Sequence, residues 1–253
     1  MGRIFETRKA TMFARWNKMA KVFTRISKDI AIAVKAAGPN PKDNSALRRA
    51  LQNARGANMP KDKVEAAIKR ASGQDQQAYE VVLYEGYGPG GVAVLCEIRT
   101  DNRNRTAADL RLAFSKHGGN LGETGCVSYL FEQRSVVRLE AGDLPEEALL
   151  ERLLELEEAG GPAVVGYNLD REGADVLAAY ADLEALQDGL RGLGLPVAGW
   201  EHRWIAPLPC RLDSEDTLRP CLRMLDALED LDDVRSVTSN LEADEDLLIA
   251  VME

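Results

Sequence analysis

Apolar residues recur every three or four positions in the first third of the chain, a spacing that predicts amphipathic helices. One helix is expected over residues 19–37. A second should begin where Asn44 or Ser45 can cap it, and a third where Pro60 suits a first helical turn. The sequence therefore predicts a small three-helix bundle. Its inward positions are Val22, Phe23, Ile26, Ile30, Val34, Leu47, Ala50, Leu51, Ala54, Val64, Ala67, Ile68 and Ala71.

The pattern changes after a polar linker at residues 72–77, where shorter apolar runs predict strands. The strands expected between residues 79 and 131 are accompanied by only one helix, which is not enough to cover their sheet. A later helix and strand should therefore return to complete that sheet. The expected strands lie at 79–84, 92–98 and 127–131, the helix at 103–117, and the returning helix and strand at 215–231 and 234–239.

Residues 134–205 predict a complete unit of their own. Their order is β-α-β-β-α-β, which is that of a ferredoxin-like domain. The expected strands lie at 135–139, 163–167, 174–178 and 197–204, and the helices at 145–159 and 182–193.

These elements predict an α+β multidomain protein, and 253 residues are enough for two or three domains. A basic helical domain is expected at 1–78 and a discontinuous α+β domain at 79–133 plus 206–253. The ferredoxin-like domain at 134–205 is then inserted into the middle one. The N-terminal three-helix domain is thus followed by two α+β domains.

Charge is distributed unevenly along the chain. Residues 1–78 hold 17 Lys and Arg against 6 Asp and Glu, whereas the remainder holds 15 against 35, and the whole chain carries −9. Such a division predicts a basic module that binds polyanions on an acidic body that polyanions repel. The alternative is that the lysines only cover solvated helix faces.

Other function classes lack support in the sequence. No run approaches the roughly 18 apolar residues of a membrane span, and the first residues do not resemble a secretory signal, so we expect a cytoplasmic protein with no membrane partner. The four cysteines have no CxxC spacing, which argues against a zinc site or a disulfide framework. No nucleophile elbow, HExxH or Walker pattern occurs. We therefore predict no enzymatic activity, catalytic residue, metal or cofactor.

Two segments could contact a ligand. The glycine-rich residues 85–91 predict either a tight connection between strands or a contact to an RNA backbone. In residues 100–106, two arginines sit at the start of a helix, where the helix dipole disfavours cations. They should pair with Asp101, Glu97 or another domain's carboxylate, or else with an RNA phosphate or partner carboxylate. The possible secondary contacts are Tyr87, Gly88, Arg103 and Arg105.

Four motifs stand in an order that resembles the YebC/PmpR family, which is similar to the mitochondrial translational activator of cytochrome c oxidase. They are Asn58-Met-Pro-Lys-Asp62, Tyr84-Glu-Gly-Tyr-Gly-Pro-Gly-Gly91, Asp101-Asn-Arg-Asn-Arg-Thr106 and Gly118-Gly-Asn-Leu-Gly122. The resemblance implies a three-domain fold with a helical first domain. It also implies a regulator of gene expression. Members are labelled DNA-binding transcriptional regulators, and others are linked to translation, where they help ribosomes to synthesise proline-rich stretches. The start of this chain departs from the usual family pattern, and Cys126 stands where serine is usual.

The prediction is a non-enzymatic, nucleic-acid-binding regulator whose basic N-terminal helices grip phosphates. A ribosome or ribosomal RNA suits this charge layout, because such a partner demands no base code. Duplex DNA is the alternative, although no recognition helix or dimerising heptad stands out. An acidic protein-interaction scaffold is a third class. The oligomeric state stays open, with a monomer favoured.

The candidate nucleic-acid contacts all lie in the first 28 residues. Trp16 could stack on a base or fill the bundle core. The candidates are Arg3, Arg8, Lys9, Arg15, Trp16, Lys18, Lys21, Arg25 and Lys28.

Overall fold

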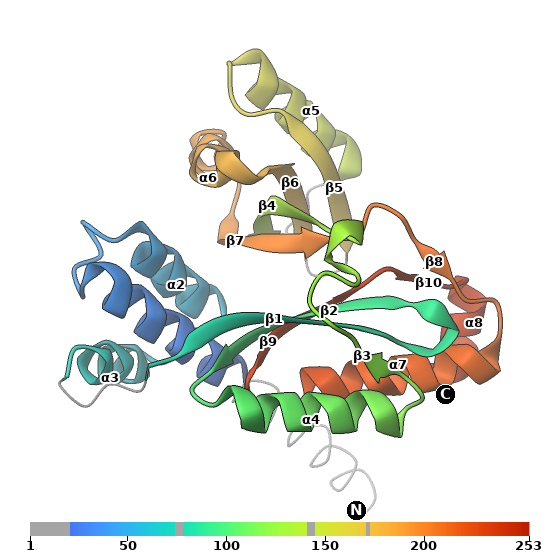
Figure 1. Ribbon diagram of the computed structural model, residues 1–253. Coiled ribbons are helices and arrows are strands. Elements are labelled where there is room, and N and C mark those ends of the chain that lie inside the picture. The colour runs from blue at the N-terminus through green and yellow to red at the C-terminus, as the bar shows by residue number, and fades with distance from the viewer. Residues whose placement is uncertain (1–20, 74–77, 141–144, 171–172, 253) are drawn as a thin grey trace, which may run out of the picture. The chain divides into compact units, whose positions relative to one another are not determined.

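The computed structural model describes residues 21–73, 78–140, 145–170 and 173–252 (Figure 1). The chain forms two compact units, each built from two segments. One unit joins residues 1–77 to 134–203, and the other joins 78–133 to 204–253. We call residues 21–73 the basic helical part. Because it falls in one unit with residues 134–203, the division into three domains stays a prediction.

The basic helical part contains three helices from residue 21 onward, which confirms the predicted bundle. Residues 21–37 are helical, α2 spans Ser45–Gly56 and α3 spans Lys61–Ala71. Pro60 is the residue before α3 and not part of its first turn, a small correction to the expectation. The buried core consists of the predicted inward positions Ile26, Ile30, Val34, Leu47, Ala50, Ala54, Ala67 and Ala71, together with Ala33 and Met59.

Asn44 is the cap of α2, and Ser45 is the first residue of that helix. The Asn44 side-chain oxygen accepts the backbone N–H of Leu47 at 2.9 Å. Its amide nitrogen donates to the carbonyls of Ala33 and Gly38, each at 2.8 Å. This buried side chain therefore joins the end of the first helix to the beginning of the second.

The second unit is built on a four-stranded sheet of order β3-β1-β2-β9. The strands β1, β2 and β9 are antiparallel neighbours, and the returning helix and strand are present as predicted. The elements are β1 Glu80–Tyr87, the 3-10 turn η1 Pro89–Gly91, β2 Ala93–Thr100, α4 Arg103–Lys116, β3 Asn120–Leu121, α7 Glu215–Glu229 and β9 Val234–Ser239.

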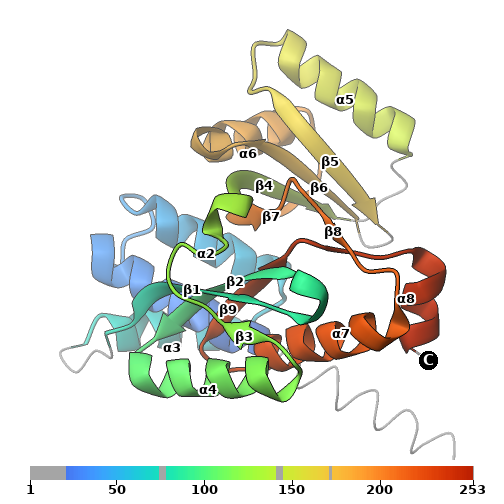
Figure 2. The same ribbon diagram turned by 45° about the vertical axis from the view of Figure 1, so that its right-hand side comes forward.

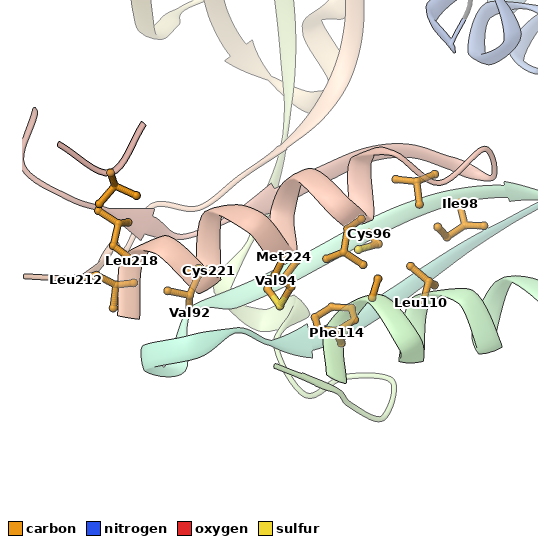
Figure 3. Close-up of a cluster of buried hydrophobic side chains, with 14 residues drawn as sticks. Val92, Val94, Cys96, Ile98, Leu110, Phe114, Leu212, Leu218, Cys221 and Met224 are labelled. Atoms are coloured by element: carbon orange, nitrogen blue, oxygen red, sulfur yellow. The ribbon is translucent and has the colours of Figure 1, made fainter. Parts of the chain in front are cut away.

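Helices α4 and α7 cover one face of this sheet (Figures 1 and 3). Alternate side chains of a strand point to opposite faces, so every second residue around β2 enters this core. The burial of these side chains is the main force holding the helices to the sheet. Its members include Val92, Val94, Cys96 and Ile98 from the β2 region, Leu110 and Phe114 from α4, and Leu218, Cys221 and Met224 from α7.

The prediction of a strand at residues 127–131 is wrong. A 3-10 turn, η2, spans Ser128–Leu130, and the chain becomes extended only at Phe131. Val127 and Phe131 are buried against Ala93 and Leu95 on the sheet face opposite α4 and α7. The apolar run therefore reports a buried turn and not a strand.

The C-terminal part of this unit contains three short elements that the sequence did not reveal. Strands β8 and β10 form a parallel pair, and helix α8 follows them. The acidic run at residues 242–246 leads into α8, whose Val251 is buried in the core. The bounds are β8 Cys210–Arg211, β10 Leu241–Glu242 and α8 Glu245–Met252.

Residues 132–205 have the predicted ferredoxin-like arrangement (Figure 2). The sheet order is β5-β6-β4-β7. Helix α5 connects β4 to β5, and β6 lies between these two strands and pairs with both. Helices α5 and α6 contribute leucines to a core on one face of this sheet. The elements are β4 Glu132–Glu140, α5 Glu146–Glu158, β5 Val164–Asp170, β6 Gly173–Ala179, the turn η3 Tyr180–Asp182, α6 Leu183–Gly192 and β7 Val197–Ile205.

Within the described ranges, no helix is both long enough and apolar enough to cross a membrane.

Candidate nucleic-acid interface

The basic helical part concentrates positive charge on its surface. Between residues 21 and 73 there are 12 Lys and Arg against four Asp and Glu, a net charge of +8. The apolar sides of the three helices face one another. Most of their cations are exposed, whereas Asn53 on the polar side of α2 bonds to the backbone of Trp200. The exposed cations are Lys35, Lys42, Arg48, Arg55, Lys61, Lys63, Lys69 and Arg70.

The predicted contact residues divide into two groups. Lys21, Arg25 and Lys28 lie on the helix of residues 21–37 and are half-buried there. Their spacing of four and three residues places them along one side of that helix. As nucleic-acid contacts they stay a prediction. The other six, Arg3, Arg8, Lys9, Arg15, Trp16 and Lys18, lie outside the described residues.

Sequence reasoning missed the cations of α2 and α3 as candidates, although the charge count of residues 1–78 contains them. Arg55 lies in the last turn of α2, and Lys69 and Arg70 lie in the last turn of α3. A cation at the C-terminal end of a helix is favoured by the helix dipole. These side chains therefore stabilise the helices that carry them. Because they are exposed, they are also accessible to the phosphates of a nucleic acid.

Some cations of this surface also have structural contacts. The Arg48 guanidinium donates to the carbonyls of Pro41 and Lys42 at 3.0 Å each and so closes the turn before α2. The Lys63 ammonium lies 5.5 Å from the centre of the Phe23 ring, within cation–π range. Charge and packing are therefore combined in these two residues.

The motif at residues 58–62 shapes the turn between α2 and α3. Asn58 has a φ of 54°, and it is the only non-glycine residue in the described ranges with a positive φ. Asparagine tolerates this left-handed conformation better than most residues. Met59 follows it into the core, and its backbone N–H donates to Ala54 at 2.8 Å. The motif therefore sets the angle at which α3 leaves α2.

The glycine-rich segment is a tight connection between β1 and β2. Gly90 and Gly91 have φ values of 73° and 80°, which favour glycine. The buried Gly88 donates its N–H to Val92 at 2.7 Å, and a Cβ there would lie 2.7 Å from Met224 Cε. Tyr87 donates its hydroxyl to the carbonyl of Cys126 at 2.8 Å. These contacts give Tyr87 and Gly88 structural roles, and their contact with nucleic acid stays a prediction.

The arginines at the start of α4 have internal carboxylate partners. Asn102 caps the helix by accepting the N–H of Arg105 at 3.1 Å. The Arg105 guanidinium lies 2.8 Å from Asp101 and 2.7 Å from Asp233, and hydrogen bonds to Asp233 and Asp101 raise its pKa. Arg103 lies 2.5 Å from Glu80. Internal pairing, one of the two alternatives for this segment, is thus present, and contact with a partner stays a prediction.

Glu85 is the residue of this region whose role the sequence did not reveal. Its buried carboxylate accepts the backbone N–H groups of Gly125, Val127 and Ser128 at 2.7, 2.8 and 2.7 Å. Burial by itself would raise the pKa of Glu85, but these hydrogen bonds outweigh it and hold the pKa below the ordinary value of 4.5. The backbone N–H groups of Gly125, Val127 and Ser128 are therefore bonded to a side chain and not to a neighbouring strand.

The described residues contain no group of three or more His, Cys, Asp and Glu side chains arranged to hold a metal ion. The four cysteines are free. Burial raises the pKa of Cys96 to about 12 and that of Cys221 to about 11, and it also raises the pKa of Cys126. Because the thiolate is the reactive form, these three thiols are poor nucleophiles.

The chain matches known families over most of its length. Residues 3–74 match the domain described as "TACO1/YebC protein N-terminal domain". Residues 79–241 match "TACO1/YebC second and third domain".

Related proteins are similar over the same extent. Those from Anaeromyxobacter dehalogenans (strain 2CP-C) and Myxococcus xanthus (strain DK1622) are each 54% identical over 244 residues, which is 95% of this chain and 100% of theirs. Both are named "Probable transcriptional regulatory protein". The crystal structure of a conserved hypothetical protein from Aquifex aeolicus is 37% identical, with a TM-score of 0.82 over 89% of this chain and 91% of that one.

Proposed function

Because the chain belongs to the TACO1/YebC family, we propose that it is a non-enzymatic, nucleic-acid-binding regulator of gene expression that acts on ribosomal RNA during translation. The observation that carries this proposal is the set of eight exposed lysines and arginines on the basic helical part, whose net charge over residues 21–73 is +8. Such a surface attracts the phosphate backbone and releases its counterions. In this role the protein relieves ribosomes that stall at proline-rich stretches.

The second unit is a poor alternative for phosphate binding, because several of its arginines are held by carboxylates. Exposed pairs of this kind add little to stability, but they neutralise the cation locally. Polyanions therefore meet accessible positive charge mainly on the helices. The paired arginines include Arg103 with Glu80, Arg105 with Asp101 and Asp233, Arg211 with Asp213 and Asp244, and Arg219 with Glu215.

A DNA-binding transcriptional regulator is the second candidate function. The names of the relatives from A. dehalogenans and M. xanthus favour it. The two candidates use the same basic surface, because both duplex DNA and ribosomal RNA present phosphates. The two functions differ in which nucleic acid the protein prefers when ribosomes and duplex DNA are both present.

Co-sedimentation with ribosomes at near-physiological salt, with excess duplex DNA present, tests the proposal. The wild-type protein should pellet with ribosomes despite the DNA. A K69Q/R70Q variant should pellet less, because it removes two exposed cations from the last turn of α3. The matched control is R111Q/K116Q, which removes one exposed arginine and one exposed lysine from α4 and should behave as wild type.

Three outcomes separate the functions. Loss of the protein from the pellet when DNA is added favours the transcriptional regulator. Equal binding by K69Q/R70Q and wild type argues against the basic helical part as the interface. Binding that survives deletion of residues 1–78 would favour an acidic protein-interaction scaffold.

A further inference from the structure

One edge of the ferredoxin-like part carries four exposed apolar side chains. Leu150 and Leu154 of α5 are 39% and 60% exposed, and Val165 and Leu169 of β5 are 53% and 40% exposed. Single exposed apolar residues are common on proteins, but several on adjoining elements mark an interaction surface.

Hydrogen bonds place α5 directly beside β5, as both ribbon views also show (Figures 1 and 2). The hydroxyl of Tyr167 donates to Glu146 at 2.7 Å, and the backbone N–H of Val164 donates to Glu157 at 2.7 Å. The two glutamates stand near opposite ends of α5. The helix therefore runs along the strand and not across it.

The exposed leucines lie on α5 next to the side that packs on the sheet, which carries the buried Leu149, Leu153 and Leu156. Glu146, Leu150, Leu154 and Glu157 are four, four and three residues apart, which aligns them along one side of a helix. Since the first and last of them bond to β5, the two leucines lie on the flank of α5 nearest that strand. We call the side chains of Leu150, Leu154, Val165 and Leu169, together with the exposed Glu147, Glu151 and Glu158, the α5 surface.

The strand beneath this surface, β5, is one of the two edge strands of its sheet. In the order β5-β6-β4-β7, β5 pairs with β6 alone. The register of this pair shifts between Val164 and Gly166, and such bulges protect the edges of sheets from unwanted pairing. Because the bulge hinders the addition of another strand at this edge, we expect a partner to bind here through side-chain contacts.

The charge around these leucines is strongly negative. Helix α5 carries six glutamates and one arginine. Glu146 and Glu157 bond to β5, and Glu155 pairs with Arg152 at 2.8 Å. The remaining three, Glu147, Glu151 and Glu158, are exposed. Nucleic acid is repelled by such a surface, whereas a cationic partner is attracted to it.

We propose that the α5 surface binds a basic polypeptide segment of a partner protein. Apolar side chains of the segment pack on Leu150 and Leu154, and its lysines or arginines pair with Glu147, Glu151 and Glu158. Apolar burial supplies the affinity, and the opposite charges select the partner and speed its approach. This interaction uses a different surface from the proposed phosphate contacts and does not depend on them.

A peptide of lysine and leucine, about 18 residues long with its leucines on one helical side, serves as the probe. Its binding to the full chain is measured by fluorescence anisotropy. Wild type should bind, and an L150S/L154S variant should bind about tenfold more weakly. The matched control, L112S/L208S, replaces two leucines that are each 65% exposed on the other unit and should leave binding unchanged.

A second variant keeps the leucines and removes the charge. E147Q/E151Q/E158Q should weaken peptide binding and flatten its dependence on salt, because the screened attraction is lost. Equal binding by wild type and L150S/L154S, or no binding by wild type, overturns the proposal. Sedimentation of wild type without peptide tests the other occupant: self-association that L150S/L154S abolishes would assign the surface to a second copy of the chain.

Discussion

The guanidinium of Arg105 at the start of α4 lies 2.7 Å from the carboxylate of Asp233, which is 128 residues away in the sequence and directly precedes β9. The same Asp233 oxygen accepts the hydroxyls of Thr100 and Thr106 at 3.1 and 2.7 Å. One carboxylate therefore ties the end of β2 and the first turn of α4 to the segment that completes the sheet.

Replacing Asp233 by alanine should destabilise the second unit by about 2 kcal/mol, because two buried hydroxyls and one guanidinium lose an acceptor. The measurement is the free energy of unfolding from urea denaturation. An Asp213→Ala variant is the control, since its exposed carboxylate pairs with Arg211 at the surface. Equal stability of the two variants would contradict the role given to Asp233.

Glu85 should make stability depend on pH. Its pKa is lowered in the folded state, so its contribution is full above the ordinary value of 4.5 and is lost as pH falls through the folded pKa. Replacing Glu85 by glutamine should cost about 2 kcal/mol at pH 7, since charge-assisted bonds to three N–H groups are weakened. Unfolding free energies of both proteins, measured from pH 7 to pH 3, should converge at the acid end. A constant difference across this range would show that the charge of Glu85 is not responsible.

Asn44 should matter more than its neighbour Ser45, although either residue type can cap a helix. Asn44→Ala removes three hydrogen bonds from a buried site and should cost about 2 kcal/mol in the basic helical part. Ser45→Ala affects an exposed residue inside the first turn and should be nearly neutral. Hydrogen exchange of the α2 amides reports the local effect. Similar exchange in the two variants would argue that the cap is not the stabilising feature.

Local patterns in the sequence were sufficient for much of the architecture. The periodic apolar positions placed the three helices, and the order of runs between residues 134 and 205 was enough to recognise the ferredoxin-like arrangement. In each case the signal lies within one element or between neighbours in the chain.

Interactions between distant residues account for what the sequence could not reveal. The turn at residues 125–128 depends on Glu85, about 40 residues earlier, and an apolar run alone cannot distinguish such a turn from a strand. Arg105 was expected to pair with some carboxylate, yet only the fold identifies Asp233 as one partner. The exposed cations of α3 were overlooked because their accessibility depends on which sides the bundle buries.

The central claim is that the basic helical part binds nucleic acid through phosphates, and the salt dependence of affinity tests it most directly. The dissociation constant for ribosomal RNA is measured over a series of salt concentrations for wild type, K69Q/R70Q and R111Q/K116Q. Wild-type affinity should fall steeply as salt rises. In K69Q/R70Q the slope of log affinity against log salt should be smaller by about 0.7 to 0.9 for each phosphate that the variant no longer neutralises. R111Q/K116Q should keep the wild-type slope. A flat response in wild type, or the same slope in all three proteins, would contradict the account.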